Sequence, residues 1–201
     1  MIADVELLER WRAGDSTAGE ELFERYFDAM VRFFRNKLAE ATDDLVQRTF
    51  LACVEGRDRL REDASFRSYL FGVAHNLLRK HFDRREAEPI DFTARSAFDL
   101  GPSPSSVAAK TQAEQILLDG LRRIPLDYQI ALELHYWEEL MAAEIADATA
   151  VPLGTAKTRL RRGRELLLEK VAELTRAMGD TTEPIDIDRR AREVRSRLLA
   201  M

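Results

Sequence analysis

The most informative stretch of the chain runs from Met141 to Leu167 and reads MAAEIADATAVPLGTAKTRLRRGRELL. Its first part predicts a short helix that ends near Ala148, and a turn follows at Ala150 and Val151. Pro152 favours the first turn of a new helix, because its ring fixes a helical φ and it has no N–H to leave unpaired. The segment therefore predicts two helices joined by a tight turn, a helix-turn-helix.

The second helix of this segment separates apolar from basic residues. Ala156, Leu160, Gly163 and Leu167 recur at helical spacing and predict an inward face. The other faces carry hydroxyl and cationic side chains, namely Thr155, Lys157, Thr158, Arg159, Arg161 and Arg162. A helix fits the major groove, where arginine and lysine bind guanine edges and threonine binds a base or a phosphate. These six residues are candidates for duplex DNA binding, and a surface helix with solvated arginines is the alternative.

Apolar residues at helical spacing extend this segment on its N-terminal side, from Ile116 to Trp137 with a break at Pro125. Residues 110–174 are therefore expected to form a small helical domain. The tail, residues 175–201, predicts a short basic amphipathic helix from Asp188 to Leu199. This helix could dock on an acidic surface of the same protein or on a regulator, and a frayed, solvated end is the alternative.

The N-terminal part of the chain, residues 1–86, predicts a separate bundle of three helices. Apolar residues recur at helical intervals over Glu20–Leu38, Asp43–Leu60 and Phe66–Arg85. Between the two helical parts, residues 87–109 are rich in proline, glycine and serine, which is typical of a flexible linker. The expected fold is all-α, with two small helical domains joined by this linker.

Two basic islands stand out from a chain whose net charge is −5. Residues 67–85 carry 5 basic residues and 1 acidic residue, and residues 152–170 carry 6 and 2. In the first island aromatic rings alternate with cations, which suits stacking on unpaired bases beside neutralised phosphates. Rings at helical spacing are also typical of a hydrophobic core, and we favour this role for Phe66 and Phe82. For Tyr69 and Phe71, packing in the core and stacking on bases both remain open.

Composition excludes several classes of protein. The 201 residues are 45% hydrophobic and 33% charged, as in soluble globular proteins. No apolar run approaches the ~20 residues of a membrane span, and the start MIADVELLERW lacks a secretion signal, so we expect a cytoplasmic protein with no membrane partner. Cys53 is the single cysteine, and three histidines without cysteine partners disfavour zinc. We expect no enzyme activity, no catalytic residues, no metal site and no cofactors.

Thr42, Asp43 and Asp44 open the second predicted helix, where acids stabilise the helix dipole without any partner. The order of motifs is more specific: ATDDLVQRTF, then FRSYLFGVAHNLLRKHFDRR, a Pro/Ser linker, and AAEIADATAVPLGTAKTRLRRGRELL. Over about residues 18–174 this order resembles the extracytoplasmic-function (ECF) sigma factors of bacterial RNA polymerase, in the sigma-70 superfamily. The resemblance implies a region 2-like helical bundle, a region 4-like helix-turn-helix domain, and an alternative sigma factor that directs transcription initiation.

The resemblance also implies roles for individual residues. By this resemblance, the residues expected to contact the polymerase β′ clamp helices are Asp43, Asp44, Leu45, Gln47 and Phe50. The melted minus-ten element would be held by Arg61, Ser65, Arg67, Tyr69, Phe71, His75, Asn76, Arg79 and Lys80. The six helix-turn-helix residues would read the minus-thirty-five duplex. The implied partners are core RNA polymerase, including its β subunit, and promoter DNA, and control by an anti-sigma factor or another regulator is left open.

Three positions depart from the family pattern. Ala41 replaces a usual acid, His75 stands where the family often has arginine, and Met141 replaces a capping serine or threonine, which forfeits roughly 1 kcal/mol. Two other functions therefore stay open: a stand-alone helix-turn-helix regulator, and a polymerase-associated adaptor without promoter selectivity. Co-purification with core polymerase separates the first from a sigma factor, and promoter-dependent initiation separates the second.

Overall fold

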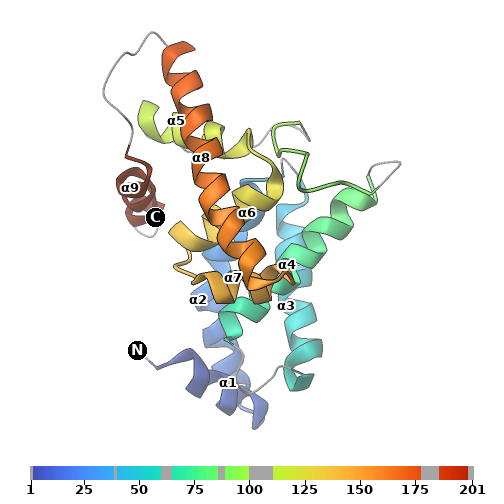
Figure 1. The fold of residues 1–201 in the computed structure, drawn as a ribbon. Helices are drawn as coiled ribbons and strands as arrows, with labels where there is room; N and C mark the ends of the chain where they lie inside the picture. Colours follow the sequence, from blue (N-terminus) through green and yellow to red (C-terminus); the bar gives the residue numbers. More distant parts are fainter. Residues whose placement is uncertain are drawn as a thin grey trace.

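Helices dominate the computed structural model of the protein, which describes residues 2–38, 40–59, 65–85, 89–99, 111–177 and 186–198 (Figure 1). Within these residues the β-type pairing is one isolated bridge between Ser96 and Pro125. The predicted all-α fold is therefore confirmed.

The N-terminal half contains the three predicted helices and one further helix before them. Asp15 caps the long second helix, because its carboxylate accepts hydrogen bonds from the N–H groups of Thr17 at 3.1 Å and Ala18 at 3.3 Å. The helices are α1 (Asp4–Arg12), α2 (Ser16–Arg35), α3 (Thr42–Gly56) and α4 (Phe66–Asp83), with a 3₁₀ turn, η1 (Arg57–Arg59), after α3.

The C-terminal half contains the predicted helix-turn-helix. Ala150 takes a left-handed conformation, φ +52°, and makes the tight turn between its two helices. Met141 provides no side-chain cap, as expected, although Glu144 accepts a hydrogen bond from the Met141 N–H at 2.8 Å. The helices are α5 (Gln112–Arg122), α6 (Leu126–Tyr136), α7 (Ala142–Thr149), α8 (Leu153–Ala177) and α9 (Ile187–Leu198).

The two halves share one hydrophobic core. Helix α4 packs directly against α7, as Figure 1 shows. A Cβ atom at Gly72 would lie 3.3 Å from the carbonyl oxygen of Ala148, so the absence of a side chain lets these helices approach closely. Leu70 and Ala74 of α4 belong to the same buried cluster as Ile145 of α7. Sequence periodicity could identify each amphipathic helix, but not this contact between helices far apart in the chain.

Part of the predicted flexible linker is firmly packed, which corrects that prediction for residues 89–99. Phe92 and Ala97 are buried. The carbonyl of Phe92 accepts a hydrogen bond from the Asp127 N–H at 3.0 Å, and that of Arg95 accepts one from the Leu126 N–H at 2.9 Å. These contacts fix the segment on the start of α6. The remaining linker positions, 87–88 and 100–109, lie outside the described residues.

Candidate nucleic-acid and polymerase interfaces

Helix α4 exposes part of its predicted DNA-binding face. Ser65 caps its start, where the hydroxyl accepts a hydrogen bond from the Ser68 N–H at 3.4 Å. Asn76 and Lys80 are exposed and stand one turn apart. The Arg79 guanidinium lies 4.6 Å from the centre of the Phe92 ring, a cation–π contact that holds it beside the packed part of the linker.

Phe71 and His75 do not lie on that exposed face, which corrects their prediction as DNA contacts in this conformation. Phe71 is 1% exposed and packs edge-on against Phe33, with ring centres 5.7 Å apart. His75 is 4% exposed and packs edge-on against Phe92 at 6.1 Å. The reason is that α4 has neighbours on two sides, its own bundle and α7, so a second side of the helix becomes interior. Phe66 and Phe82 are buried, as predicted.

The remaining predicted minus-ten contacts are partly engaged within the protein. Arg67 is half-buried and donates a hydrogen bond to the carbonyl oxygen of Glu138, in the loop before α7. Tyr69 is half-buried, and its hydroxyl reaches the end of α3, where only glycine at position 56 leaves room for it. Arg61 lies outside the described residues.

Helix α8 carries most of its predicted DNA-binding residues on the surface. Lys157 and Thr158 are exposed and Thr155 is half-buried. Arg161 and Arg162 both pair with Glu165, at 2.5 Å and 3.0 Å, but their side chains remain 68% and 46% exposed. Exposed pairs of this kind contribute little stability, so both arginines are available to exchange Glu165 for phosphate.

Arg159 differs from the other cations of α8, and its prediction as a duplex contact is corrected for this conformation. Its guanidinium pairs with Asp127 of α6, and the two side chains are 14% and 4% exposed. Burial raises the pKa of Asp127, and Arg159 opposes that rise by stabilising the carboxylate. Arg159 therefore neutralises a buried acid inside the C-terminal half.

The predicted polymerase-binding residues on α3 separate into surface and core positions. Asp43, Asp44 and Gln47 are exposed, and Phe50 is half-buried. Leu45 is completely buried, which corrects its prediction as a polymerase contact. It faces the interior because it belongs, with Thr49 and Cys53 at helical spacing, to the buried stripe of α3.

An apolar patch beside these residues was missed by the sequence reasoning. Leu51 and Val54 on α3 and Phe27 on α2 are 58%, 47% and 50% exposed. Phe27 stacks on Phe50 with ring centres 6.4 Å apart, which joins the two helices into one surface. A detectable signal was present, because residues 43, 47, 51 and 54 follow helical spacing on one side of α3. Exposed apolar groups beside carboxylates suit a protein partner.

Two ion pairs join the halves. Lys37 pairs with Glu133 of α6 with both side chains almost fully buried, and Arg32 of α2 pairs with Glu138 at 3.3 Å. Burial lowers the pKa of Lys37 and raises the pKa of Glu133, and in both groups the partner's charge opposes the shift. The lysine ammonium also donates to the Phe33 carbonyl at 2.7 Å. The closed arrangement therefore has a specific polar contact at its centre.

The described residues include no group of three or more histidine, cysteine or acidic side chains placed to hold a metal ion. Among the helices in the described ranges, none combines the length and apolar character required to cross a bilayer.

Two family models match the chain: Sigma-70 region 2 over residues 22–88, and Sigma-70, region 4 over residues 114–167. Together they cover more than half of it. An ECF RNA polymerase sigma-E factor of Haemophilus influenzae is 25% identical over 86% of this chain and 97% of its own length. The RNA polymerase sigma-H factor of Pseudomonas aeruginosa is 28% identical over 86% of this chain and 96% of its own.

Solved structures share the fold. CnrH, determined in complex with the cytosolic domain of CnrY, superposes with a TM-score of 0.62 at 21% identity and covers 88% of this chain and 99% of its own. The sigma factor RpoE of Bartonella quintana, determined in complex with the anti-sigma factor NepR, gives a TM-score of 0.59 at 18% identity and covers 76% and 96%.

Proposed function

Because the chain belongs to the sigma-70 family, as an ECF sigma factor, we propose that it binds core RNA polymerase, directs it to a particular class of promoters and helps open the duplex. The observation that carries this proposal is the presence of both sigma regions, in order, in one all-helical chain. It acts in the cytoplasm as a binding protein, with no covalent chemistry and no cofactor.

Three separate exposed surfaces are proposed to bind polymerase, single-stranded DNA and duplex DNA. Asp43, Gln47, Leu51 and Val54 on α3, together with Phe27, form the proposed polymerase-binding surface. Asn76, Arg79 and Lys80 on α4 are proposed to bind the melted minus-ten strand, where cations neutralise phosphates. The exposed cations of α8 are proposed to bind the minus-thirty-five duplex.

The contact between α4 and α7 bears directly on this function. Phe71 is buried against Phe33 and His75 against Phe92 of the packed linker, and Arg67 donates a hydrogen bond to the carbonyl oxygen of Glu138 in the C-terminal half. We propose that the halves separate before α4 holds single-stranded DNA, and that polymerase supplies the binding energy for that change. An anti-sigma factor that favours the closed arrangement is a candidate regulator.

Replacing Leu51 with aspartate tests the polymerase-binding surface. We expect the affinity for core polymerase to fall about tenfold or more, because the substitution places a charge in an apolar contact. Titration of labelled protein with core enzyme measures the change. Val5→Asp, which alters a 64% exposed residue on α1, is the matched control and should bind like the parent protein. Equal affinities for both variants would remove α3 from the interface.

Replacing Arg161 or Arg162 with alanine tests the duplex-binding surface. If the side chain contacts phosphate, the slope of log affinity against log salt should fall by about one unit. If it reads a base, specificity at one position should relax by about 1–3 kcal/mol. Arg176→Ala, at the far exposed end of the same helix, is the control. Unchanged binding in every single variant from Lys157 to Arg164 would argue against this helix.

Transcription with purified core enzyme on a promoter library tests the proposed function as a whole. We expect initiation at a restricted set of sequences that requires this protein. A stand-alone helix-turn-helix regulator would not co-purify with core polymerase, and an adaptor would co-purify without selecting start sites. Either result would replace the proposal with the corresponding alternative.

A further inference from the structure

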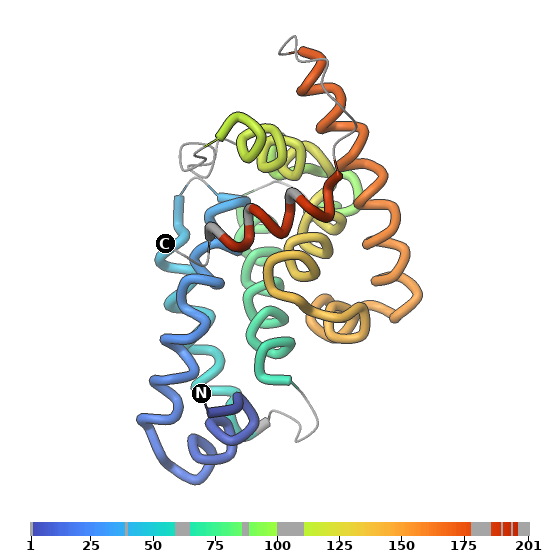
Figure 2. Tube along the Cα trace, turned by 90° about the vertical axis from the view of Figure 1, so that its left-hand side faces the viewer, coloured from blue at the N-terminus to red at the C-terminus, as the bar shows by residue number. Residues whose placement is uncertain are grey.

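The C-terminal helix α9 is docked, although it lies beyond the region 4 segment. Ile187 and Ala191, one turn apart, are 1% and 3% exposed. Ile187 belongs to the buried cluster of the C-terminal half, and Ala191 lines a pocket with residues of that half. Figure 2 shows α9 on the outside of the molecule, next to α5 and α6, which make its main helix contacts. Asp188 accepts hydrogen bonds from the Tyr136 hydroxyl and from Arg164. Helix α9 is therefore docked rather than frayed.

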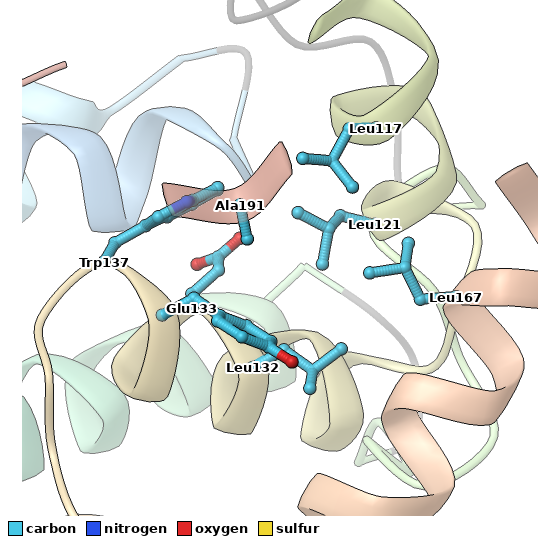
Figure 3. A pocket seen from close by; sticks show the side chains of 8 residues that line it. Leu117, Leu121, Leu132, Glu133, Trp137, Leu167 and Ala191 are labelled. Atoms are coloured by element: carbon cyan, nitrogen blue, oxygen red, sulfur yellow. The ribbon is translucent and has the colours of Figure 1, made fainter. Parts of the chain in front are cut away.

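The surface beneath α9 is a groove with apolar walls. Ala191 faces a pocket between α5, α6 and α8, as Figure 3 shows, and the side chains around it are Leu117, Leu121, Leu132, Trp137 and Leu167. Glu133, which pairs with Lys37 of the N-terminal half, also lines this pocket. Glu133 of α6 therefore lies next to both α9 and the central contact between the halves.

A second route connects α9 to the closed arrangement through the loop between α6 and α7. Arg195 of α9 donates a hydrogen bond to the Trp137 carbonyl at 3.0 Å and pairs with Glu139 at 2.7 Å. Between them, Glu138 pairs with Arg32 of α2, and its carbonyl accepts a hydrogen bond from Arg67 of α4. Three consecutive loop residues thus contact the tail on one side and the N-terminal half on the other.

We propose that α9 is an intramolecular clasp: by occupying the groove on α5, α6 and α8 and holding the loop of residues 137–140, it stabilises the closed packing of α4 against α7. Release of α9 frees this loop, weakens its contacts with Arg32 and Arg67, and raises the population in which the two halves are apart. As an effect on transcription, this inference rests on the proposed function.

The test uses the full chain with spin labels on cysteines introduced at Asp28 and Glu169, exposed positions on α2 and α8. The native Cys53 does not compete for the label, because it is buried and burial raises the pKa of its thiol to about 12. Ile187→Asp undocks α9 by placing a charge in the groove, at a helix start where aspartate is itself favourable. Ser196→Asp, exposed on the same helix, is the control.

We expect Ile187→Asp to raise the population with the longer inter-label distance about fivefold or more, which is the lower end of the coupling typical of linked sites. Ser196→Asp should give the same distances as the parent protein. Arg195→Ala removes the loop contacts without undocking Ile187, and a smaller shift in the same direction is expected. Its control is Arg192→Ala, whose Nε bonds within its own helix. Unchanged distances in Arg195→Ala and in a chain ending after Ala177 would overturn the clasp.

Transcription with limiting core enzyme separates the two proposals. If the variants open the molecule and transcription rises about fivefold, both stand. A second outcome is that neither the parent chain nor any variant supports transcription, although the distances shift as expected. The proposed sigma function is then wrong, and the clasp stands as a structural device. If the parent chain transcribes and opening leaves its rate unchanged, the sigma function stands and the effect of the clasp on transcription is refuted.

Discussion

Replacing Lys37 with methionine is expected to lower the free energy of unfolding by about 3–5 kcal/mol, because Glu133 is left as a buried charge without its partner. The two side chains are 0% and 3% exposed, so water cannot replace the lost contact in the folded state. Gln129 would still donate a hydrogen bond to Glu133 at 2.8 Å, but an amide does not neutralise a carboxylate. Urea denaturation followed by circular dichroism measures the loss.

Two further variants make this prediction specific. Lys37→Met combined with Glu133→Leu should recover most of the loss, since replacing both members of a buried pair with apolar residues is often nearly neutral. Arg48→Met breaks the exposed pair with Asp44, whose side chains are 39% and 62% exposed, and should cost at most about 1 kcal/mol. A Lys37→Met variant that is no less stable than Arg48→Met would show that the buried pair does not stabilise the fold.

The fold was largely predictable because local rules determine helices. The apolar stripe of α4, the proline before α8 and the capping Asp15 of α2 each act within a few residues, so the sequence displays them directly. The helix-turn-helix and the amphipathic tail were predictable for the same reason. Helix α1 was not singled out, although Leu7, Leu8 and Trp11 are buried, because its 9 residues are fewer than the roughly 11–18 over which helical periodicity is recognised.

Contacts between distant parts of the chain were not predictable from periodicity. Lys37 and Glu133 are separated by 96 residues. Lys37 lies in the turn after α2 and Glu133 lies in α6, so no local pattern links them. The same limit explains three corrected residues, which are suitable for nucleic-acid binding when their own helices are considered alone. Phe71 packs on Phe33 of α2, His75 packs on Phe92 of the linker, and Arg159 pairs with Asp127 of α6. The division of the chain into domains at residues 86, 109 and 174 stays a prediction. One buried cluster contains residues from both sides of the first two boundaries.

The exposed positions of several candidate residues, in contrast, were predictable from the sequence. Asn76 and Lys80 on α4, and Lys157, Arg161 and Arg162 on α8, could be placed on the surface from spacing alone, because each lies opposite a buried apolar stripe. Leu51 and Val54 share helical spacing with Asp43 and Gln47, but their apolar side chains are typical of a core, so spacing alone did not assign them to the surface. Recognising an interface made of apolar residues requires the exposure that only the structure supplies.

His75 should make the closed molecule sensitive to acid. Burial, with the nearby charges of Arg79, Arg159 and Lys37, lowers its pKa from 6.5 to about 4, and neither ring nitrogen has a hydrogen-bond partner among the described residues. Above about pH 7.5 the ring is neutral in the folded and unfolded chains and has no effect on stability. As the pH falls from there to about 4, the unfolded chain binds a proton that the folded chain cannot, and the stability decreases by about 3 kcal/mol.

Two replacements that do not titrate isolate this effect from the carboxylates that also bind protons in acid. His75→Phe and His75→Asn differ in shape and polarity, so their stabilities at about pH 8 should differ, but both should lose the same part of the pH dependence relative to the parent protein. Urea denaturation at a series of pH values measures the difference between each variant and the parent chain. Because His75 contacts Phe92 of the packed linker and faces Arg159 of α8, protonation acts where the two halves meet. Parallel curves for all three proteins would mean that His75 is already protonated, or already hydrated, in the folded chain, and the closed interface around it would then be looser than its burial indicates.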